Sequence, residues 1–339
     1  MKLKFGKSVL GTKKPFLIAE IGSNHNQSLK IAKESIEAAK ECGADAVKFQ
    51  SINLKELYKN PSITTQKLHN IIDLDESWHQ HLSNHCKKNK INFLSTPTYL
   101  KAITILSKIN VKAYKIASAQ AAIFPQLIEQ VARKNKLTFI STGLSTFKEI
   151  HEVIKIFKKV QNNKFVIMYC NSEYPPNPKL VNIKRVLDLK KKFKCEVGFS
   201  DHTKSSVASI AAIGLGAIVI EKHFKINDNI KSPDSHFSLN PYEFNKFSSD
   251  IREFELINNY KPRNKLENQE RIFRSKINHY MVATKDIING QIINNTNSKL
   301  LRSGYINNSF IDANYAYNKK ITCKSLIKKD QWIKKNQIK

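Results

Sequence analysis

The chain has 339 residues, of which 41% are hydrophobic and 25% charged, and its formal net charge is +29. It is long enough for one large domain and a small one, and no run reaches the roughly twenty apolar residues that would span a membrane. The basic residues are spread along the whole sequence, so we expect solvated helix faces and an anionic small substrate, and no nucleic-acid partner.

Short runs rich in Ile, Val and Phe recur along the first two thirds of the chain and predict β-strands. In chain order they cover residues 16–21, 46–49, 92–94, 113–116, 138–140, 165–169, 196–199 and 218–220. Segments with helical periodicity lie between them, at residues 29–42, 77–89, 125–135, 145–159, 180–193, 205–214 and 241–257. This alternation predicts an α/β fold, a (β/α)8 barrel of the TIM type.

The chain after residue 257 is expected to leave the barrel. Residues 258–275 are polar and contain Pro262, as linkers do. Residues 276–339 alternate strand-like pieces with turns such as Asn289-Gly290 and predict a small β-rich domain. The predicted domains are therefore a barrel over residues 1–257, a linker over 258–275 and a small domain over 276–339.

Polar residues follow nearly every predicted strand at its C-terminal end. They are Glu20, Lys48 with Gln50, Ser95 with Thr96, Lys115 with Ser118, Ser141 with Thr142, Asn171 with Ser172, Ser200 with His202, and Glu221 with His223. The C-terminal ends of parallel barrel strands meet at one mouth, so these clusters predict one active site there. Lysines and hydroxyls suit the phosphate and carboxylate of a substrate.

Two histidines stand at the ends of consecutive predicted strands and are candidate metal ligands. Imidazole is a good ligand for ions such as Zn²⁺ or Mn²⁺, and a site with two protein ligands keeps positions open for substrate. His202 and His223 would face one pocket if their strands are neighbours. The alternative is a pair of unrelated surface histidines.

The cysteines indicate the compartment. The chain has five, with no Cys-x-x-Cys pair and no even framework, which favours reduced thiols in a cytosol. The first residues, 1–7, lead into a short basic segment without the apolar core of a signal peptide. We therefore expect a cytoplasmic protein.

Taken together, these motifs resemble those of the sialic acid synthase family, which includes pseudaminic and legionaminic acid synthases. The matching stretches are residues 18–22, 24–26, 43–50, 95–97, 114–118, 141–143, 174–175, 198–203, 221–224, 233–234 and 237–239. The resemblance extends over nearly the whole chain. Residues 282–287 and 302–304 resemble the antifreeze-like (SAF) domain of these synthases, a small β-clip fold.

The resemblance implies condensation of phosphoenolpyruvate (PEP) with an N-acylated hexosamine such as N-acetylmannosamine, giving a nine-carbon 2-keto acid and phosphate by C–O cleavage. It assigns the phosphate and carboxylate of PEP to Lys48, Thr96, Lys115, Ser118, Ser141, Ser172 and Ser200. His202 and His223 would bind Mn²⁺, with Mg²⁺ or Co²⁺ as alternatives, and the ion would polarise the aldehyde. The expected catalytic residues are Glu20, Lys48 and Lys115, with Glu20 handling the proton of the water that adds.

The sugar is expected to meet Gln50, Tyr174 and Asp234. Arg302 would reach its acyl amide from the small domain of a second subunit, which implies a domain-swapped homodimer. Two residues depart from the family pattern. Gln120 occupies a substrate-binding position where the family often has an acidic residue, and Ser303 stands where Pro commonly follows the arginine.

Three other functions remain open on the sequence. The acceptor could be a 2,4-diacetamido hexose, which would make the enzyme a pseudaminic or legionaminic acid synthase. Lys115 could form an imine, as in an aldolase or lyase of keto sugars, although two lysines, metal ligands and many hydroxyls suit phosphate better. The chain could also be a sugar-binding protein that has lost catalysis, for which Gln120 is the only indication.

Overall fold

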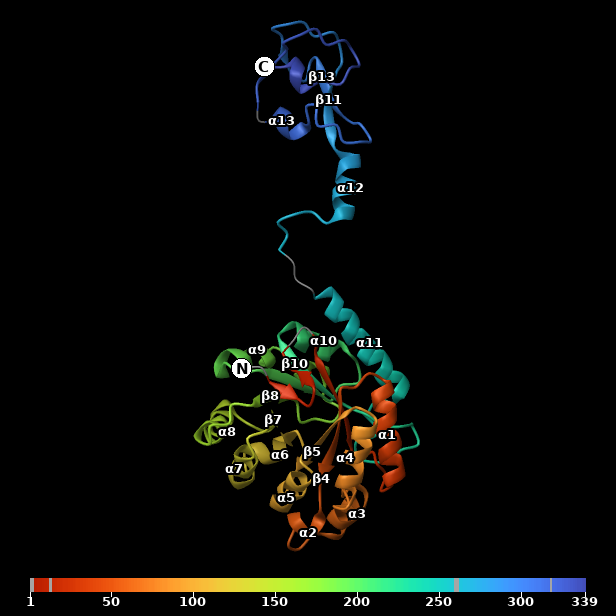
Figure 1. The fold of residues 1–339 in the computed structure, drawn as a ribbon, viewed down its shortest axis with the longest axis vertical. Coiled ribbons are helices and arrows are strands. Elements are labelled where there is room, and N and C mark those ends of the chain that lie inside the picture. The colour runs from red at the N-terminus through yellow and green to blue at the C-terminus, as the bar shows by residue number, and fades with distance from the viewer. Residues whose placement is uncertain (1–2, 12–13, 259–261, 318) are drawn as a thin grey trace. The chain divides into compact units, whose positions relative to one another are not determined.

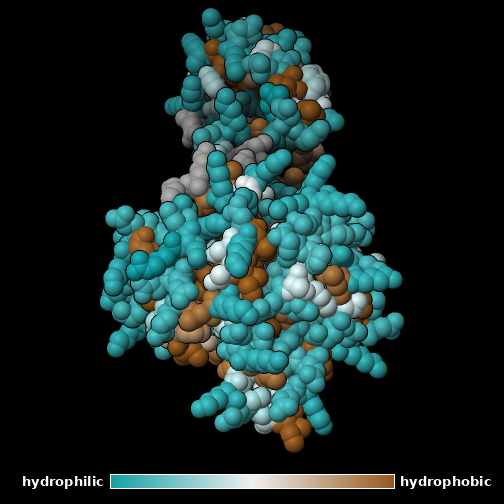
Figure 2. Space-filling model, turned by 60° about the horizontal axis from the view of Figure 1, so that its bottom comes forward, coloured by the Kyte–Doolittle hydropathy of each residue, from teal (hydrophilic) through white to brown (hydrophobic). Residues whose placement is uncertain are grey.

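The computed structural model describes residues 3–11, 14–258, 262–317 and 319–339. The chain divides into two compact units, Met1–Asn259 and Tyr260–Lys339 (Figure 1). Within these described ranges no helix is both long enough and apolar enough to cross a membrane. The face drawn in Figure 2 is covered mostly by hydrophilic side chains, as the net charge leads one to expect.

Eight parallel strands form the sheet of the first unit, in the order β5-β4-β3-β10-β9-β8-β7-β6. The two end strands, β5 and β6, lie beside each other, so the sheet forms a nearly closed barrel (Figure 1). The strands are β3 (Phe16–Gly22), β4 (Ala46–Ser51), β5 (Asn92–Pro97), β6 (Ala113–Ile116), β7 (Leu137–Ser141), β8 (Phe165–Cys170), β9 (Val197–Asp201) and β10 (Ala217–His223). The predicted (β/α)8 barrel is confirmed.

Helices surround the barrel because each presents one apolar face to the strands. They are α1 (Leu29–Glu41), α4 (Trp78–Lys88), α5 (Leu100–Lys108), α7 (Pro125–Arg133), α8 (Phe147–Lys159), α9 (Arg185–Phe193), α10 (Val207–Gly214) and α11 (Pro241–Ile257). Short helices α2 (Leu54–Leu57), α3 (Ile63–Ile72) and α6 (Ser118–Ala121) follow β4 and β6. Local signals start several of them: the Ser28 hydroxyl accepts the N–H of Ile31 at α1, and Thr146 and Glu149 form a capping box at α8. Helix α5 was missed in the sequence.

The lower half of the barrel interior is an apolar core, called the floor cluster below. It consists of Leu3, Phe5, Leu10, Phe16, Ile18, Ala46, Leu94, Ala113, Leu137, Phe139, Val166, Met168 and Val219. An N-terminal hairpin, β1 (Lys4–Phe5) with β2 (Ser8–Val9), closes this end. The ring of Phe5 lies 5.5 Å from that of Phe16 and 5.8 Å from that of Phe139. The sequence did not predict the hairpin.

The second unit is rich in β-structure, as expected. Strand β11 (His279–Ala283) pairs with β13 (Ser298–Arg302), and β12 (Ile292–Ile293) pairs with β14 (Ile321–Thr322), both antiparallel. Its core includes Met281, Ile287 and Ile333. It also contains α13 (Ala313–Tyr317) and the 3-10 turn η2 (Lys335–Gln337).

The segment predicted as a linker, residues 258–275, differs from the expectation. It includes most of helix α12 (Asn268–Ile277), which Glu267 and Glu270 begin with a capping box. Residues 259–261 of this segment lie outside the described ranges. The residues of α12 are largely exposed, so the apolar periodicity that marks a packed helix is weak in the sequence.

Candidate active site

Several of the polar residues predicted at strand ends lie inside the strands, on the face that lines the barrel, whereas Ser118, Ser172 and His202 follow their strands. Side chains of a strand alternate between its two faces. Glu20 therefore follows Ile18 of the floor cluster on β3, and Ser141 follows Phe139 on β7. By the same step of two residues, Lys48 follows Ala46, Lys115 follows Ala113, and Glu221 follows Val219. Glu20, Lys48 and Lys115 fall within their predicted strands. Ser141 and Glu221 were expected just after the strands predicted over residues 138–140 and 218–220, and the structure extends β7 and β10 to include them.

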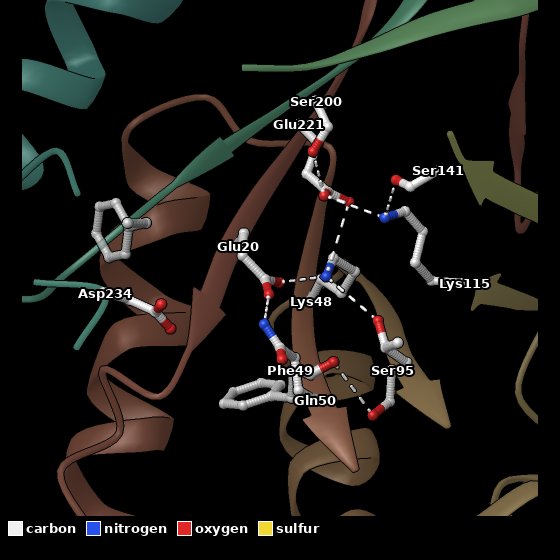
Figure 3. A network of polar contacts seen from close by, with 12 residues as sticks. Glu20, Lys48, Phe49, Gln50, Ser95, Lys115, Ser141, Ser200, Glu221 and Asp234 are labelled. Atoms are coloured by element: carbon white, nitrogen blue, oxygen red, sulfur yellow. Dashed lines mark hydrogen bonds and ion pairs between the residues drawn. The ribbon is translucent and has the colours of Figure 1, made fainter. Parts of the chain in front are cut away.

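Lys48 lies between two buried carboxylates (Figure 3). Its Nζ is 2.8 Å from Glu20 Oε2 and 3.8 Å from Glu221 Oε2, and it donates to Thr96 Oγ1 at 3.3 Å. Gln50 Nε2 donates to the other oxygen of Glu20 at 2.7 Å. All the charged side chains here are almost completely buried.

Glu221 links this group to the second lysine. Its Oε1 is 3.3 Å from Lys115 Nζ and accepts the Ser200 hydroxyl at 2.7 Å. Lys115 in turn donates to Ser141 Oγ at 2.8 Å (Figure 3). Two lysines, two carboxylates and several hydroxyls therefore form one continuous network across the barrel mouth. Glu221 was singled out in the sequence only as a strand-end residue; its polar side chain in an apolar run was the available signal.

The two carboxylates differ strongly in acidity. Burial raises the pKa of Glu20 to about 7, although Lys48 opposes this shift. Burial also acts against ionisation of Glu221, but Lys115 and Lys48 outweigh it and lower its pKa to about 2. Carboxyl groups whose pKa values are pushed apart in this way can divide acid–base and electrostatic roles. Near neutral pH, Glu221 is therefore an anion, while Glu20 can accept or release a proton.

Each lysine also has a shifted pKa. Burial lowers the pKa of Lys48, but the negative charges of Glu20 and Glu221 raise it by a larger amount, so its pKa lies above the usual value. The pKa of Lys115 falls because of burial and the nearby Lys48, with Glu221 opposing. Both ammonium groups point into the barrel mouth and can bind an anionic substrate.

A group of small donors lies beside Lys115, at the ends of β6, β7 and β8. Ser118 Oγ, at the start of α6, accepts the Gly143 N–H at 3.0 Å and lies 3.1 Å from Cys170 Sγ. The hydroxyl oxygen of Ser172 is buried and has no hydrogen-bond partner within the described residues. The same holds for Gln120 Oε1. Polar atoms buried without partners indicate places where a ligand would supply the missing hydrogen bonds.

His202 and His223 face each other, with ring centroids 5.5 Å apart. His202 Nδ1 is 2.7 Å from the Asn171 carbonyl oxygen, which can only accept, so Nδ1 carries the proton and Nε2 keeps its lone pair. Burial and then His223 lower the pKa of His202 to about 3; burial lowers that of His223 to about 4, with Lys48 adding to it and Asp234 opposing. Two neutral imidazoles side by side fit a divalent cation.

No cluster of three or more His, Cys, Asp or Glu residues suited to a metal occurs in the described ranges. An ion held by the two histidines would thus take its other ligands from water or substrate. The Nδ1 atom of His223 is buried and has no hydrogen-bond partner among the residues that the structure describes. Aromatic rings border the pair: Tyr174 lies 4.3 Å from His202, and Phe237 lies 4.6 Å from His223, centroid to centroid.

Asp234 reaches the same mouth from the loop after β10. Its Oδ2 accepts the N–H of Ser23 at 2.9 Å and the Ser23 hydroxyl at 2.7 Å. Burial opposes ionisation, but His223 and the Ser23 hydrogen bonds hold the pKa of Asp234 below its usual range. Gly22 lies close by at φ +52°, and a Cβ there would be 2.5 Å from Asp234 Oδ2. Glycine is therefore required on both backbone and steric grounds.

The predicted residues of the first unit thus gather at one mouth. One set of contacts joins Glu20, Lys48, Gln50 and Thr96. A second set, centred on Glu221, joins Lys115, Ser141 and Ser200, and the hydroxyls of Ser118 and Ser172 lie beside this second set. The side of the mouth next to them is formed by the rings of His202, His223 and Tyr174. Arg302 lies at the end of β13 in the second unit, where its side chain is exposed. It stays a prediction.

Comparison with known proteins gives consistent relatives. Residues 35–261 match the model of the NeuB family. An N,N'-diacetyllegionaminic acid synthase of Campylobacter jejuni is 36% identical, covering 84% of this chain and 89% of its own. A pseudaminic acid synthase of that species is 33% identical, covering 86% and 88%. The solved structure of an N-acetylneuraminic acid (sialic acid) synthetase from Leptospira borgpetersenii, in complex with citrate, has a TM-score of 0.75 and 28% identity, covering 81% of this chain and 96% of that chain.

Proposed function

Because the chain belongs to the NeuB family, among relatives named as synthases of acidic sugars, we propose that it condenses PEP with an N-acylated hexosamine. The products would be a nine-carbon 2-keto sugar acid and inorganic phosphate. The observation that supports this most is the pair of buried lysines, Lys48 and Lys115, which converge with hydroxyl donors above an apolar floor. PEP carries a phosphate and a carboxylate, so it needs two such cationic positions.

A divalent cation fits the two histidines. We propose that His202 and His223 hold Mn²⁺, with Mg²⁺ or Co²⁺ as alternatives, and that the bound ion supplies Lewis-acid polarisation of the sugar aldehyde. The neutral state of both imidazoles leaves nitrogen lone pairs for this purpose. Phe237 and Tyr174 border the pair.

The protein residues then have distinct tasks. Lys115, Ser118, Ser141 and Ser172 would hold the phosphate, while Lys48, Thr96 and Ser200 would hold the carboxylate and the rest of PEP. C3 of PEP attacks the aldehyde carbon, and the aldehyde oxygen takes up a proton. Water adds to C2, and Glu20, with its pKa near 7, accepts the proton of that water. The C2–O bond to the phosphate breaks as the new C2 hydroxyl gives its proton to the departing phosphate, leaving the keto group and inorganic phosphate. The proton that Glu20 takes from water balances the one that the aldehyde oxygen takes up.

The acceptor sugar would contact Gln50, Gln120, Tyr174 and Asp234. Our first candidate is an N-acetylmannosamine-like sugar, as in sialic acid synthesis. A 2,4-diacetamido hexose is a second candidate, supported by relatives named as N,N'-diacetyllegionaminic acid synthase, 36% identical, and pseudaminic acid synthase, 33% identical. Arg302 would reach the acyl amide from a second subunit of a domain-swapped homodimer. Truncation after Lys261 should then raise the KM of the sugar more than that of PEP.

The test is phosphate release from PEP by the purified protein with Mn²⁺. The panel of acceptors contains N-acetylmannosamine, its 6-phosphate and 2,4-diacetamido hexoses, each with and without EDTA. Release with one sugar that EDTA abolishes supports the proposal and names the acceptor. If no phosphate is released from PEP, and borohydride traps an imine formed with pyruvate, the protein would be an aldolase and the synthase assignment would be wrong. Silence in both assays, with sugar binding retained, would favour the binding protein.

A further inference from the structure

We propose that Cys170 and Gly143 are positioning residues of the phosphate pocket, acting through the hydroxyls of Ser118 and Ser172. This inference rests on the proposed function, because it assigns the phosphate of PEP to these hydroxyls. Cys170 ends β8 and Gly143 follows β7 by two residues. Neither has a role in the mechanism above, yet both touch the donors that the mechanism uses.

Cys170 continues the inward row of β8. Val166 and Met168 belong to the floor cluster, and Cys170 is the next residue on the same face. In the register of the sheet, Cys170 lies opposite Ser200 of β9, and Ser141 of β7 lies opposite Met168, one inward position earlier on β8. The thiol is therefore a member of the polar layer that lines the mouth, and it is 4% exposed. Its contact is Ser118 Oγ, at 3.1 Å.

The hydrogen bonds of Ser118 decide where its proton points. A hydroxyl has one proton to donate and two lone pairs to accept with. The N–H of Gly143 occupies one lone pair, at 3.0 Å. When an anion enters, the thiol of Cys170 can donate its proton to the other lone pair. The hydroxyl proton of Ser118 is then left for the anion, which is a stronger acceptor than sulfur.

Gly143 makes room for this arrangement. A Cβ at this position would collide with Ser172 Oγ and would lie 2.8 Å from Cys170 Sγ and 3.0 Å from Ser118 Oγ. The three groups converge on the face of Gly143 only because it has no side chain. The buried, unpartnered Ser172 Oγ is one of them and indicates a missing ligand on this side. A side chain at residue 143 would push the two hydroxyls apart.

The experiment measures binding of inorganic phosphate and of PEP to the full chain by calorimetry, together with the KM values for PEP and for the sugar. Cys170→Ala should weaken phosphate and PEP by about three- to tenfold, the size of one hydrogen bond, and leave the KM of the sugar unchanged. Cys170→Ser restores a donor and should recover most of that loss. Gly143→Ala should weaken phosphate by more than about tenfold, because it displaces two donors.

Cys195→Ala is the matched control, since Cys195 is half-buried at the opposite end of the barrel, just before β9. Thermal unfolding of each variant confirms that binding is measured on folded protein. The positioning role would be overturned if Cys170→Ala bound phosphate as tightly as the control does. It would also be overturned if Cys170→Ala weakened the binding of phosphate and raised the KM of the sugar by the same factor. Wild-type protein that binds neither phosphate nor PEP would instead overturn the proposed function, and this inference with it.

Discussion

The floor and the mouth of the barrel are built by the same strands, yet the floor is apolar and the mouth is polar and charged. On β7, Phe139 lies in the floor against Phe5, and Ser141, two residues later, accepts a hydrogen bond from Lys115. The floor stabilises the fold by burying apolar surface, while the mouth buries charges that cost free energy unless they are paired. The residues that stabilise the barrel and those that form the candidate site are thus only two positions apart on a strand, a distance of about 7 Å.

The largest expected effect belongs to the mouth. Lys115→Met removes a cation that contacts both Ser141 and Glu221, so we expect kcat/KM for PEP to fall by about 10³-fold or more. Stability should fall by only about 1–3 kcal/mol, because Glu221 keeps Lys48 as a partner. Steady-state kinetics and urea unfolding measure the two quantities. Activity within tenfold of wild type would show that Lys115 does not bind the substrate.

The opposite pattern is expected in the floor. Phe139→Ala opens a cavity beneath the site and should destabilise the protein by about 3–5 kcal/mol. Because its ring packs against Phe5 in the floor cluster and supplies no polar group to the site, the KM values of the folded variant should stay within about twofold. A large rise in the KM of PEP, at a temperature where the variant is folded, would show that the two regions are coupled.

The pattern of strands and helices predicted most of the barrel, because apolar runs of three to six residues that alternate with amphipathic segments are compatible with few other folds. It did not give the hairpin of Lys4–Phe5 with Ser8–Val9, since two-residue strands carry no periodicity. The residues of the site were visible as polar groups at strand ends. Their partners were not: that Glu221 serves both lysines depends on how the neighbouring strands close the barrel.

Glu20 gives an intermediate effect that depends on pH. If it accepts the proton of water, activity should rise with pH through about 7, the pKa of its carboxyl in the fold. Glu20→Gln should lower kcat by about 10²-fold and remove this acidic limb, while PEP still binds. The pH profile of kcat/KM for both proteins is the measurement. An unchanged acidic limb in the variant would assign the proton transfer to another group.

The carboxyl of Glu20 should also make the free energy of unfolding depend on pH. Its pKa is about 7 in the fold and 4.5 ordinarily, so the folded state binds more protons between these values. Its contribution to stability is complete below pH 4.5 and is lost as the pH rises through 7. Relative to Glu20→Gln, wild-type protein should lose about 1–3 kcal/mol across that window. Parallel urea titrations at pH 5 and pH 8 test this, and equal losses in both proteins would contradict it.

The smallest effect is expected at Gln120, which lies in neither the floor nor the charged network. Its buried Oε1 has no partner in the described part of the chain, so a sugar hydroxyl could donate to it. Gln120→Ala should raise the KM of the sugar by about three- to tenfold and leave that of PEP unchanged, since one neutral hydrogen bond is lost. Gln120→Glu places an acceptor of nearly the same shape there and should keep sugar binding within a few-fold. If Gln120→Ala instead changed only the KM of PEP, the side chain would belong to the phosphate pocket, and the sugar would have to enter from the side of Asp234 and Gln50 alone.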